Sequence, residues 1–116
     1  MISDVFCKII KKELPAKIVA EGKEWLAIKD INPQAPVHVL LIPKKHIATT
    51  AELTEKDDGL IGKLIRVAHQ IAKKYGFSEK GYRLITNCGR HGGQLVPHLH
   101  IHLLGGKPLG TKIVQN

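Results

Sequence analysis

Polar and apolar residues alternate strictly near the C-terminal end of the chain, where every second position is a histidine. His98, His100 and His102 are each followed by an aliphatic residue. Successive side chains of a β-strand point to opposite faces of the sheet. The pattern over 98–104 therefore predicts a strand with three imidazoles on one face and aliphatic side chains on the other. Imidazole acts as a ligand, a nucleophile and a proton carrier near neutral pH, so this row is the first candidate for a functional site.

Helical spacing of apolar residues is clearest in the middle of the chain. Over 55–75 the apolar positions recur three and four residues apart with lysine and arginine between them, which predicts a long amphipathic helix. Thr54 and Asp57 resemble a capping box before this helix, and Gly76 is placed to end it. A shorter repeat predicts a second helix over 5–12.

Short apolar runs bounded by turn residues predict the other strands. These strands are expected over 18–20, 25–28, 37–42 and 82–87. The segment 30–36 contains two prolines and is predicted to be an ordered loop, and the glycine-rich loop 89–93 leads into the histidine strand. Strands in hairpin order around one long helix indicate an α+β domain with a mainly antiparallel sheet.

The composition is typical of a globular domain with an aliphatic core. Of the 116 residues, 43% are hydrophobic and only 4% are aromatic, so leucine, isoleucine, valine and alanine must fill the core. We expect a single domain over 1–116. The formal net charge of +8 favours an anionic partner. The basic residues occur in scattered pairs without interleaved aromatic residues, so direct binding of nucleic acid is the weakest candidate.

The cysteines and the N-terminus indicate the cellular location. Cys7 and Cys88 lie far apart in unrelated contexts, which predicts reduced thiols rather than a disulfide. The N-terminal residues lack the apolar core of a signal peptide, and no segment is long and apolar enough to span a bilayer. We therefore expect a cytoplasmic protein without a membrane partner.

Three explanations of the histidine row can be compared on physical grounds. The first is that the rings are ordinary surface or core histidines. The second is a zinc site, but a rise of ~3.3 Å per residue separates the outer Cα atoms by ~13 Å, which is hard to reconcile with three Zn–N bonds of ~2.0–2.1 Å to one ion. The third is catalysis on a phosphate group, in which one imidazole attacks and its neighbour stabilises the charge. The glycine-rich loop favours the third, because its backbone N–H groups can bind an anion.

The histidine row also carries a family resemblance. Residues His98–Leu104 resemble the HxHxHxx signature, with x apolar, of the histidine-triad (HIT) superfamily. Other segments are similar to its Hint branch, in order and at its spacing: Phe6–Ile10, Pro15–Ile18, Asp30–Pro36, Ile42–His46, Gly81–Arg83, Gly92–Gln94 and Leu104–Leu109. The resemblance covers essentially the whole chain.

This resemblance implies a hydrolase that cleaves the P–N bond of purine nucleoside phosphoramidates, of which adenosine 5′-phosphoramidate is typical. The reaction would pass through a nucleotidyl-histidine intermediate, use no cofactor and bind an AMP-like purine nucleotide. The implied HIT-like fold is a five-stranded antiparallel sheet with one long helix and a short N-terminal helix. The implied assembly is a homodimer with a continuous ten-stranded sheet.

The resemblance also implies roles for the histidines, position by position. His100 would be the nucleophile, and His102 would contact the α-phosphate and stabilise its charge. His98 would be structural. His38, on the predicted strand 37–42, would belong to a relay that holds His100 in the required tautomer, because an imidazole attacks through one nitrogen only if the other keeps its proton.

Nucleotide contacts are implied for a second set of residues. Asp30 matches the family's acceptor for the ribose hydroxyl groups, although an aspartate in this loop can also cap a turn. Ile31 would flank the base or the sugar. The full set implied to bind the nucleotide is Asp30, Ile31, Asn87, Gly93, Gln94, Leu95, His100 and His102. The base pocket is expected to be walled by Val19, Leu26 and Ile28, which could equally be plain core.

Two positions near the histidine strand depart from the family pattern. Many Hint relatives have a serine where this chain has Leu95, and leucine cannot donate a proton to a leaving group. This departure leaves a second hypothesis open, in which the chain is a nucleotide-binding or interaction module with weak or no catalysis. The other departure is Pro97, where an aromatic residue is frequent, and which removes one backbone donor.

A further departure concerns metal. Some bacterial relatives carry Cys-x-x-Cys near the N-terminus and bind structural zinc with two histidines. In this chain Asp4 occupies the position of the first cysteine. Asp4, Cys7, His46 and His98 are thus a remnant of the site. A carboxylate, one thiolate and two imidazoles could still bind zinc, but we expect that the site is absent.

Overall fold

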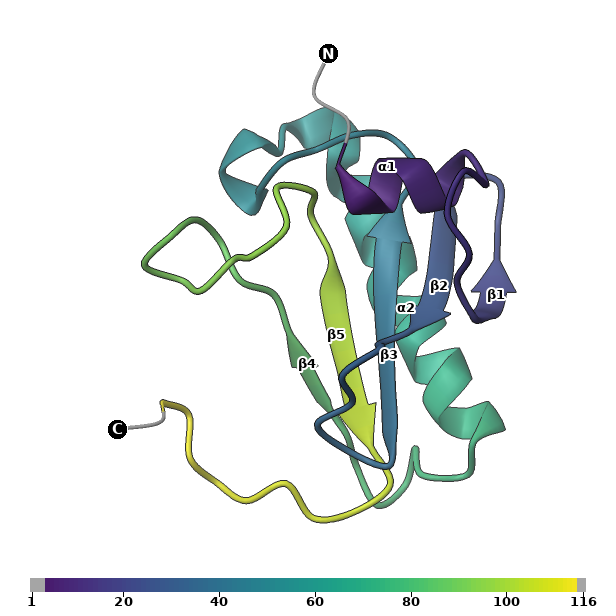
Figure 1. The fold of residues 1–116 in the computed structure, drawn as a ribbon. Helices are drawn as coiled ribbons and strands as arrows, with labels where there is room; N and C mark the ends of the chain where they lie inside the picture. The colour runs from purple at the N-terminus through teal and green to yellow at the C-terminus, as the bar shows by residue number, and fades with distance from the viewer. Residues whose placement is uncertain (1–3, 115–116) are drawn as a thin grey trace.

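The computed structural model describes residues 4–114 as one five-stranded sheet with a helix on each face (Figure 1). The elements follow in the order α1 (Val5–Ile10), β1 (Ile18–Glu21), β2 (Trp25–Lys29), β3 (Val37–Pro43), two short 3-10 helices (Thr50–Glu52 and Glu55–Asp57), α2 (Asp58–Lys74), β4 (Arg83–Ile85) and β5 (Ile101–Gly105). The strand order is β1-β2-β3-β5-β4, and every neighbouring pair is antiparallel. The predicted α+β fold is confirmed. Residues 1–3 and 115–116 of the predicted domain lie outside the described residues.

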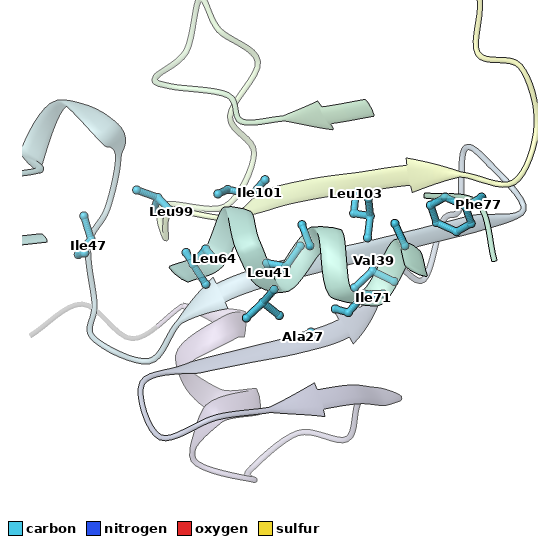
Figure 2. Packing of buried hydrophobic residues seen from close by; sticks show 13 residues of the cluster. Ala27, Val39, Leu41, Ile47, Leu64, Ile71, Phe77, Leu99, Ile101 and Leu103 are labelled. Carbon is cyan, nitrogen blue, oxygen red and sulfur yellow. The ribbon is translucent and has the colours of Figure 1, made fainter. Parts of the chain in front are cut away.

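Helix α2 covers one face of the sheet, because every second residue of the central strands points toward it (Figure 2). This α2-side core joins residues of the helix to residues of β2, β3 and β5: Leu64, Val67, Ala68, Ile71, Ala27, Val39, Leu41, Ile101 and Leu103. The capping box of Thr54 and Asp57 is confirmed, but the first predicted helical turn is a 3-10 helix and α2 itself starts at Asp58. Neither α2 nor any other helix of residues 4–114 is both long and apolar enough to cross a membrane.

Helix α1 lies on the opposite face, with the sheet between it and α2 (Figure 1). Phe6 is buried there against residues of β2 and β3: Leu26, Ile28, Leu40 and Ile42. Asp4 caps the start of α1, since its Oδ1 accepts a hydrogen bond from the Cys7 N–H at 2.8 Å. The helix ends at Ile10 rather than at residue 12, and Lys12 adopts a left-handed φ of 64°, which a continuing helix does not allow.

The alternation along β3 and β5 places two histidines on the α1 side. Val39 and Leu41 point into the α2-side core, so His38 points to the other face. The same argument applies to His102, which lies between two core residues of β5. The two histidines therefore share one face of two adjacent strands.

The histidine strand is shorter than its alternation predicts. β5 begins at Ile101, so His98 and His100 precede the paired part, and β4 covers Arg83–Ile85 instead of 82–87. The residues just before β5 form backbone hydrogen bonds outside the sheet: the Leu99 N–H donates to the Ile47 carbonyl at 2.6 Å. The side chains nevertheless keep alternating, because Leu99 is buried in the α2-side core and His98 and His100 pack against Phe6 on the other side.

Candidate active site

A pocket of about 470 Å³ opens on the α1 side of the sheet. Its volume is within the usual range of small-molecule sites, roughly 300–1,000 Å³. One part of its lining is apolar and comes from α1, β2 and β3: Phe6, Ile9, Ile28 and Leu40. The other part is polar and comes from the ends of strands and the loops: Asp30, Asn87, His100 and His102. The pocket thus offers an apolar surface and a set of hydrogen-bonding groups to one ligand.

His100 is held by the protein backbone. Its Nδ1 lies 2.8 Å from the carbonyl oxygen of His98. A carbonyl oxygen only accepts hydrogen bonds, so Nδ1 carries the proton and Nε2 of the neutral ring keeps a lone pair. The Phe6 ring packs edge-on against this imidazole, with ring centroids 5.1 Å apart. His100 is therefore a buried ring with one unprotonated nitrogen available for reaction.

His38 and His102 form a hydrogen-bonded pair whose protons are also fixed by the backbone. The Gln34 N–H donates to His38 Nδ1 at 3.1 Å, so His38 Nε2 carries the proton. That nitrogen lies 2.9 Å from His102 Nδ1 and 3.4 Å from Oδ2 of Asp30. His102 Nδ1 is then the acceptor, and the neutral ring carries its proton on Nε2. His102 thus offers an N–H donor beside the lone pair of His100.

Burial keeps this histidine pair neutral near pH 7. Burial lowers the pKa of His38, although the charge of Asp30 acts in the opposite direction. Burial, together with the positive charges that His100 and His38 carry when protonated, lowers the pKa of His102 to about 4. Both rings are therefore neutral at pH 7, and their hydrogen bonds decide which nitrogen of each ring carries its single proton.

The predicted relay from His38 to His100 does not run through a direct hydrogen bond between them in the described residues. His38 bonds to His102, and the carbonyl of His98 holds His100 instead. The strand register explains the difference, because Leu40 of β3 faces His102 and His38 lies diagonally across from it. His100 precedes the paired part of β5 and has no β3 partner there.

Asp30 and Ile31 follow β2 and line the pocket, as the sequence predicts. Oδ1 of Asp30 accepts a hydrogen bond from the Asn32 N–H at 2.8 Å, so this carboxylate caps the turn. Its second oxygen faces His38. Ile31 is 92% exposed although it is apolar, and it is available to cover a bound ligand.

The glycine-rich loop brings Asn87, Gly93 and Leu95 to the pocket but not Gln94. The Gln94 amide nitrogen donates to the carbonyls of Ala48 at 2.6 Å and Val96 at 2.9 Å. Its Oε1 accepts a hydrogen bond from the Gly89 N–H at 2.9 Å. The Gln94 amide thus ties the loop to the segment after β3, and the nucleotide contact of this residue stays a prediction.

The tight turn of this loop explains its glycines. A Cβ at position 92 would lie 2.4 Å from the carbonyl oxygen of Cys88, closer than two such atoms can approach. The Asn87 side chain donates to the Gly92 carbonyl at 2.6 Å and holds the turn closed. Leu95 follows the turn and is 93% exposed. The loop thus presents a leucine, without any donor group, at the edge of the pocket.

Of the three expected base-pocket residues, only Ile28 lines the pocket. Val19 packs against the α2-side core, and Leu26 is buried in the cluster around Phe6. Sequence reasoning missed the part of the wall formed by Phe6 and Ile9. Their spacing signals an apolar helix face, but it does not tell which face of the sheet that helix covers.

Comparison with known proteins places this site in a family. Residues 11–109 match the family model described as HIT domain. The chain belongs to the HIT domain family. This HIT protein aligns with a HIT family hydrolase from Clostridium thermocellum at a TM-score of 0.93 and 54% identity, covering 98% of this chain and 99% of that one. A HIT family hydrolase from Legionella pneumophila Philadelphia 1 aligns at a TM-score of 0.91 and 47% identity, covering 93% and 96% of the two chains.

A relative with a named activity is also similar over nearly the whole chain. The HIT protein described here is 48% identical over 111 residues to the purine nucleoside phosphoramidase of Escherichia coli (strain K12). The match covers 96% of this chain and 93% of that protein. These findings confirm the resemblance to the histidine-triad superfamily.

A second group of polar side chains in this HIT protein lies next to α1, outside the pocket lining. We call Asp4, Cys7, His46 and His98 the N-terminal cluster; their carboxylate oxygen, sulfur and ring nitrogens all lie within 4.8 Å of one another. The expectation that no metal site exists rested on Asp4 replacing a cysteine, and this convergence removes that reason. Carboxylate, thiolate and imidazole are all zinc ligands, so the residues present fit the metal.

Proposed function

We propose that this HIT protein is a hydrolase of purine nucleoside phosphoramidates, of the adenosine 5′-phosphoramidate type. The observation that carries the proposal is that the neighbouring rings of His100 and His102, with centroids 5.0 Å apart, line one pocket, the first with an unprotonated Nε2 and the second with an Nε2–H. Displacement at phosphorus requires such a nucleophile and a group that stabilises the developing charge. The similarity to the Escherichia coli purine nucleoside phosphoramidase supports the same substrate class.

The proposed reaction has two displacements at the same phosphorus. In the first, the P–Nε2 bond to His100 forms, the P–N bond to the amine breaks, and the amine takes a proton from water. The Nδ1–H of the charged ring keeps donating to the His98 carbonyl. The Nε2–H of His102 donates to a non-bridging oxygen, where negative charge develops. In the second step water attacks phosphorus and gives a proton to solvent, which replaces the one taken by the amine; the P–Nε2 bond breaks, and the nucleoside monophosphate leaves a neutral His100.

The rest of the pocket suits the rest of a purine nucleotide. The Asp30 carboxylate is a suitable acceptor for the two ribose hydroxyl groups, and Ile31 would cover the sugar or the base. The apolar wall of Phe6 and Ile9 offers a surface on which a purine can pack. Asn87 lies on the side of the histidines and would face the phosphate.

A second candidate function is a nucleotide-binding module with weak or no catalysis. Leu95 favours it, because this exposed side chain lines the pocket and cannot protonate a leaving amine. A module of this kind would bind AMP as tightly as the enzyme does but would not turn over a phosphoramidate.

Turnover of adenosine 5′-phosphoramidate, measured together with AMP binding, separates the two functions. We expect hydrolysis by the natural chain. His100→Ala should lower kcat by at least about 10³-fold and change the AMP dissociation constant by less than about threefold. His91→Ala is the matched control, because this exposed histidine lies in the glycine-rich loop outside the pocket lining. AMP binding without turnover would favour the module, and undiminished turnover in His100→Ala would reject the mechanism.

We further propose that the protein is a cytoplasmic homodimer in which two sheets join edge to edge. The two edges of the sheet are β1 and β4. The pairing of β1 with β2 is irregular between Ile18 and Ala20, and a bulged edge is a poor template for another strand. β4 pairs in regular register with β5, which favours it as the edge that a second chain extends.

A further inference from the structure

A second pocket, of about 660 Å³, adjoins the candidate active site at the end of β2. Its volume is also within the usual range of small-molecule sites. The rest of its lining comes from the chain before β1, the loop after β2, the start of β3 and the residue that follows α2. The two pockets meet along the residues that line both of them: Pro15, Ala16, Lys29, Asp30 and Ile31.

Two lysines lie opposite each other on neighbouring strands at the second pocket. Ile18 of β1 pairs with Ile28 of β2, so the next pair along these antiparallel strands is Lys17 with Lys29. The Lys29 N–H donates to the Lys17 carbonyl at 2.9 Å, in agreement with that register. Directly opposite residues have their side chains on one face, with Cβ atoms about 4.5–5.5 Å apart. Both lysines line the second pocket, which therefore holds two adjacent positive charges.

These two charges are not balanced by ion pairs in the described part of the chain. Neither Lys17 nor Lys29 forms an ion pair there, whereas four other lysines lie 2.7–3.9 Å from a carboxylate oxygen: Lys12, Lys44, Lys45 and Lys63. Like charges that lie directly opposite in a sheet repel each other. The carboxylate of Asp30 adds one negative charge, and burial lowers the pKa of His38, so that this ring adds none near pH 7. The second pocket therefore carries a net positive charge and favours an anion.

We propose that the second pocket binds a phosphate group carried on the 2′ or 3′ oxygen of the nucleotide's ribose. Asp30 lines both pockets, and the proposed function puts the ribose hydroxyl groups at its carboxylate. A substituent on one of these hydroxyl groups would extend from the candidate active site toward Lys17 and Lys29. Lysine binds phosphate as a compact positive charge. The inference rests on the proposed function and names a narrower ligand class for the same site, the ribose-phosphorylated purine nucleotides.

Asp30 opposes the added phosphate, and the balance of charges sets the size of the effect. Its Oδ1 accepts the hydrogen bond of the Asn32 N–H, and the ribose hydroxyl group without a phosphate is free to donate to Oδ2. Two lysines against one carboxylate leave a net attraction. Both lysines are exposed, so solvent and salt screen that attraction. We therefore expect a gain in affinity of several-fold and not of many orders of magnitude.

Calorimetric titrations of the full chain with AMP, adenosine 2′,5′-bisphosphate and adenosine 3′,5′-bisphosphate test this site. One of the two bisphosphates should bind at least about fivefold more tightly than AMP. The isomer that does so identifies the ribose oxygen that faces the second pocket. The ratio of the AMP dissociation constant to the bisphosphate dissociation constant should fall as the ionic strength is raised from about 0.05 M to about 0.5 M.

Lysine variants assign the gain to the second pocket. Lys17→Gln should reduce the ratio of dissociation constants by at least about threefold, and Lys17→Gln combined with Lys29→Gln should bring it below about twofold. Lys23→Gln is the matched control, because it removes the same charge from an exposed lysine in the turn between β1 and β2, outside the lining of both pockets. Its ratio should equal that of the natural chain. Because the ratio is taken within each variant, an effect on the AMP part that all three ligands share cancels.

Three results would overturn the ribose-phosphate site, and they have different consequences for the proposed function. If the natural chain bound AMP and both bisphosphates equally, the site would be rejected and the proposed function would stand. If Lys17→Gln and Lys23→Gln reduced the ratio alike, the gain would come from net charge and not from the second pocket. If neither AMP nor a bisphosphate bound, the proposed function would be rejected together with the site.

Discussion

The chemistry of the candidate site depends on which nitrogen of each imidazole carries the proton. Backbone groups make that choice: the His98 carbonyl for His100, and the Gln34 N–H for His38 and, through it, for His102. Two neighbouring rings, 5.0 Å apart between centroids, therefore supply a lone pair and a donor without any group having to ionise. Such preorganisation is the main way in which an enzyme stabilises developing charge.

Leu95→Ser should raise kcat for P–N cleavage by about tenfold or more, because a hydroxyl at this edge of the pocket can donate to the leaving amine. AMP affinity should change less, since AMP carries no leaving amine on its phosphorus. Leu95→Ala is the control, because it removes the same side chain without adding a donor, and its kcat should not rise. Steady-state rates with adenosine 5′-phosphoramidate decide the matter. A similar increase of kcat in both variants would show that the natural leucine slows the reaction by obstructing the pocket and not by the absence of a proton donor.

Among the helices and strands, periodicity predicted faces well and lengths poorly. The alternation over 98–104 correctly separated the aliphatic residues from the histidines. The alternation could not show that β5 begins to pair with its neighbours only at Ile101. That starting point depends on the length of β4 and on the hydrogen bond of Leu99 to Ile47. Local pattern fixes which side a residue faces, whereas the extent of a strand depends on its partner.

Contacts between distant segments were the part of the site that the sequence could not provide. The pairing of His38 with His102 follows from the register of β3 on β5, which no local pattern determines. The hydrogen bond of the Gln94 side chain to the Ala48 carbonyl joins segments far apart in the sequence, and no local pattern predicts it. The N-terminal cluster likewise depends on where α1 packs.

The proposed dimer can be tested at the two edge strands. Ile85→Lys on β4 should raise the dimer dissociation constant by at least about tenfold, because it replaces a 37% exposed apolar residue with a charge at the joining edge. Ile18→Lys on β1 is the matched control: that isoleucine is 48% exposed on the opposite edge, and its replacement should leave the assembly unchanged. Sedimentation equilibrium over a range of concentrations gives both values. A monomeric natural chain, or dissociation caused by the β1 variant instead, would contradict the proposal.

For the folded protein as a whole, the neutral histidine pair makes stability depend on pH. In the unfolded chain each histidine titrates near pH ~6.5. Folding lowers the pKa of His102 to about 4 and lowers that of His38 as well. Between these values the unfolded chain binds protons that the folded chain does not, so the free energy of unfolding falls as the pH is lowered from about 6.5 to about 4. Above about 6.5 both states are neutral at these positions, and their contribution no longer changes with pH.

His102→Asn isolates this effect, because asparagine does not titrate. In urea unfolding followed between pH 7 and pH 4.5, the natural chain should lose about 1–2 kcal/mol more stability than the variant, allowing for solvent screening at a ring that is only partly buried. Both proteins are measured with a chelator present, so that metal ions in the buffer do not add to the slope. His69→Asn, a change at an exposed histidine of α2, should keep the full pH dependence of the natural chain. Parallel curves for the natural chain and His102→Asn would mean that His102 titrates alike in both states, and that burial does not hold this ring neutral.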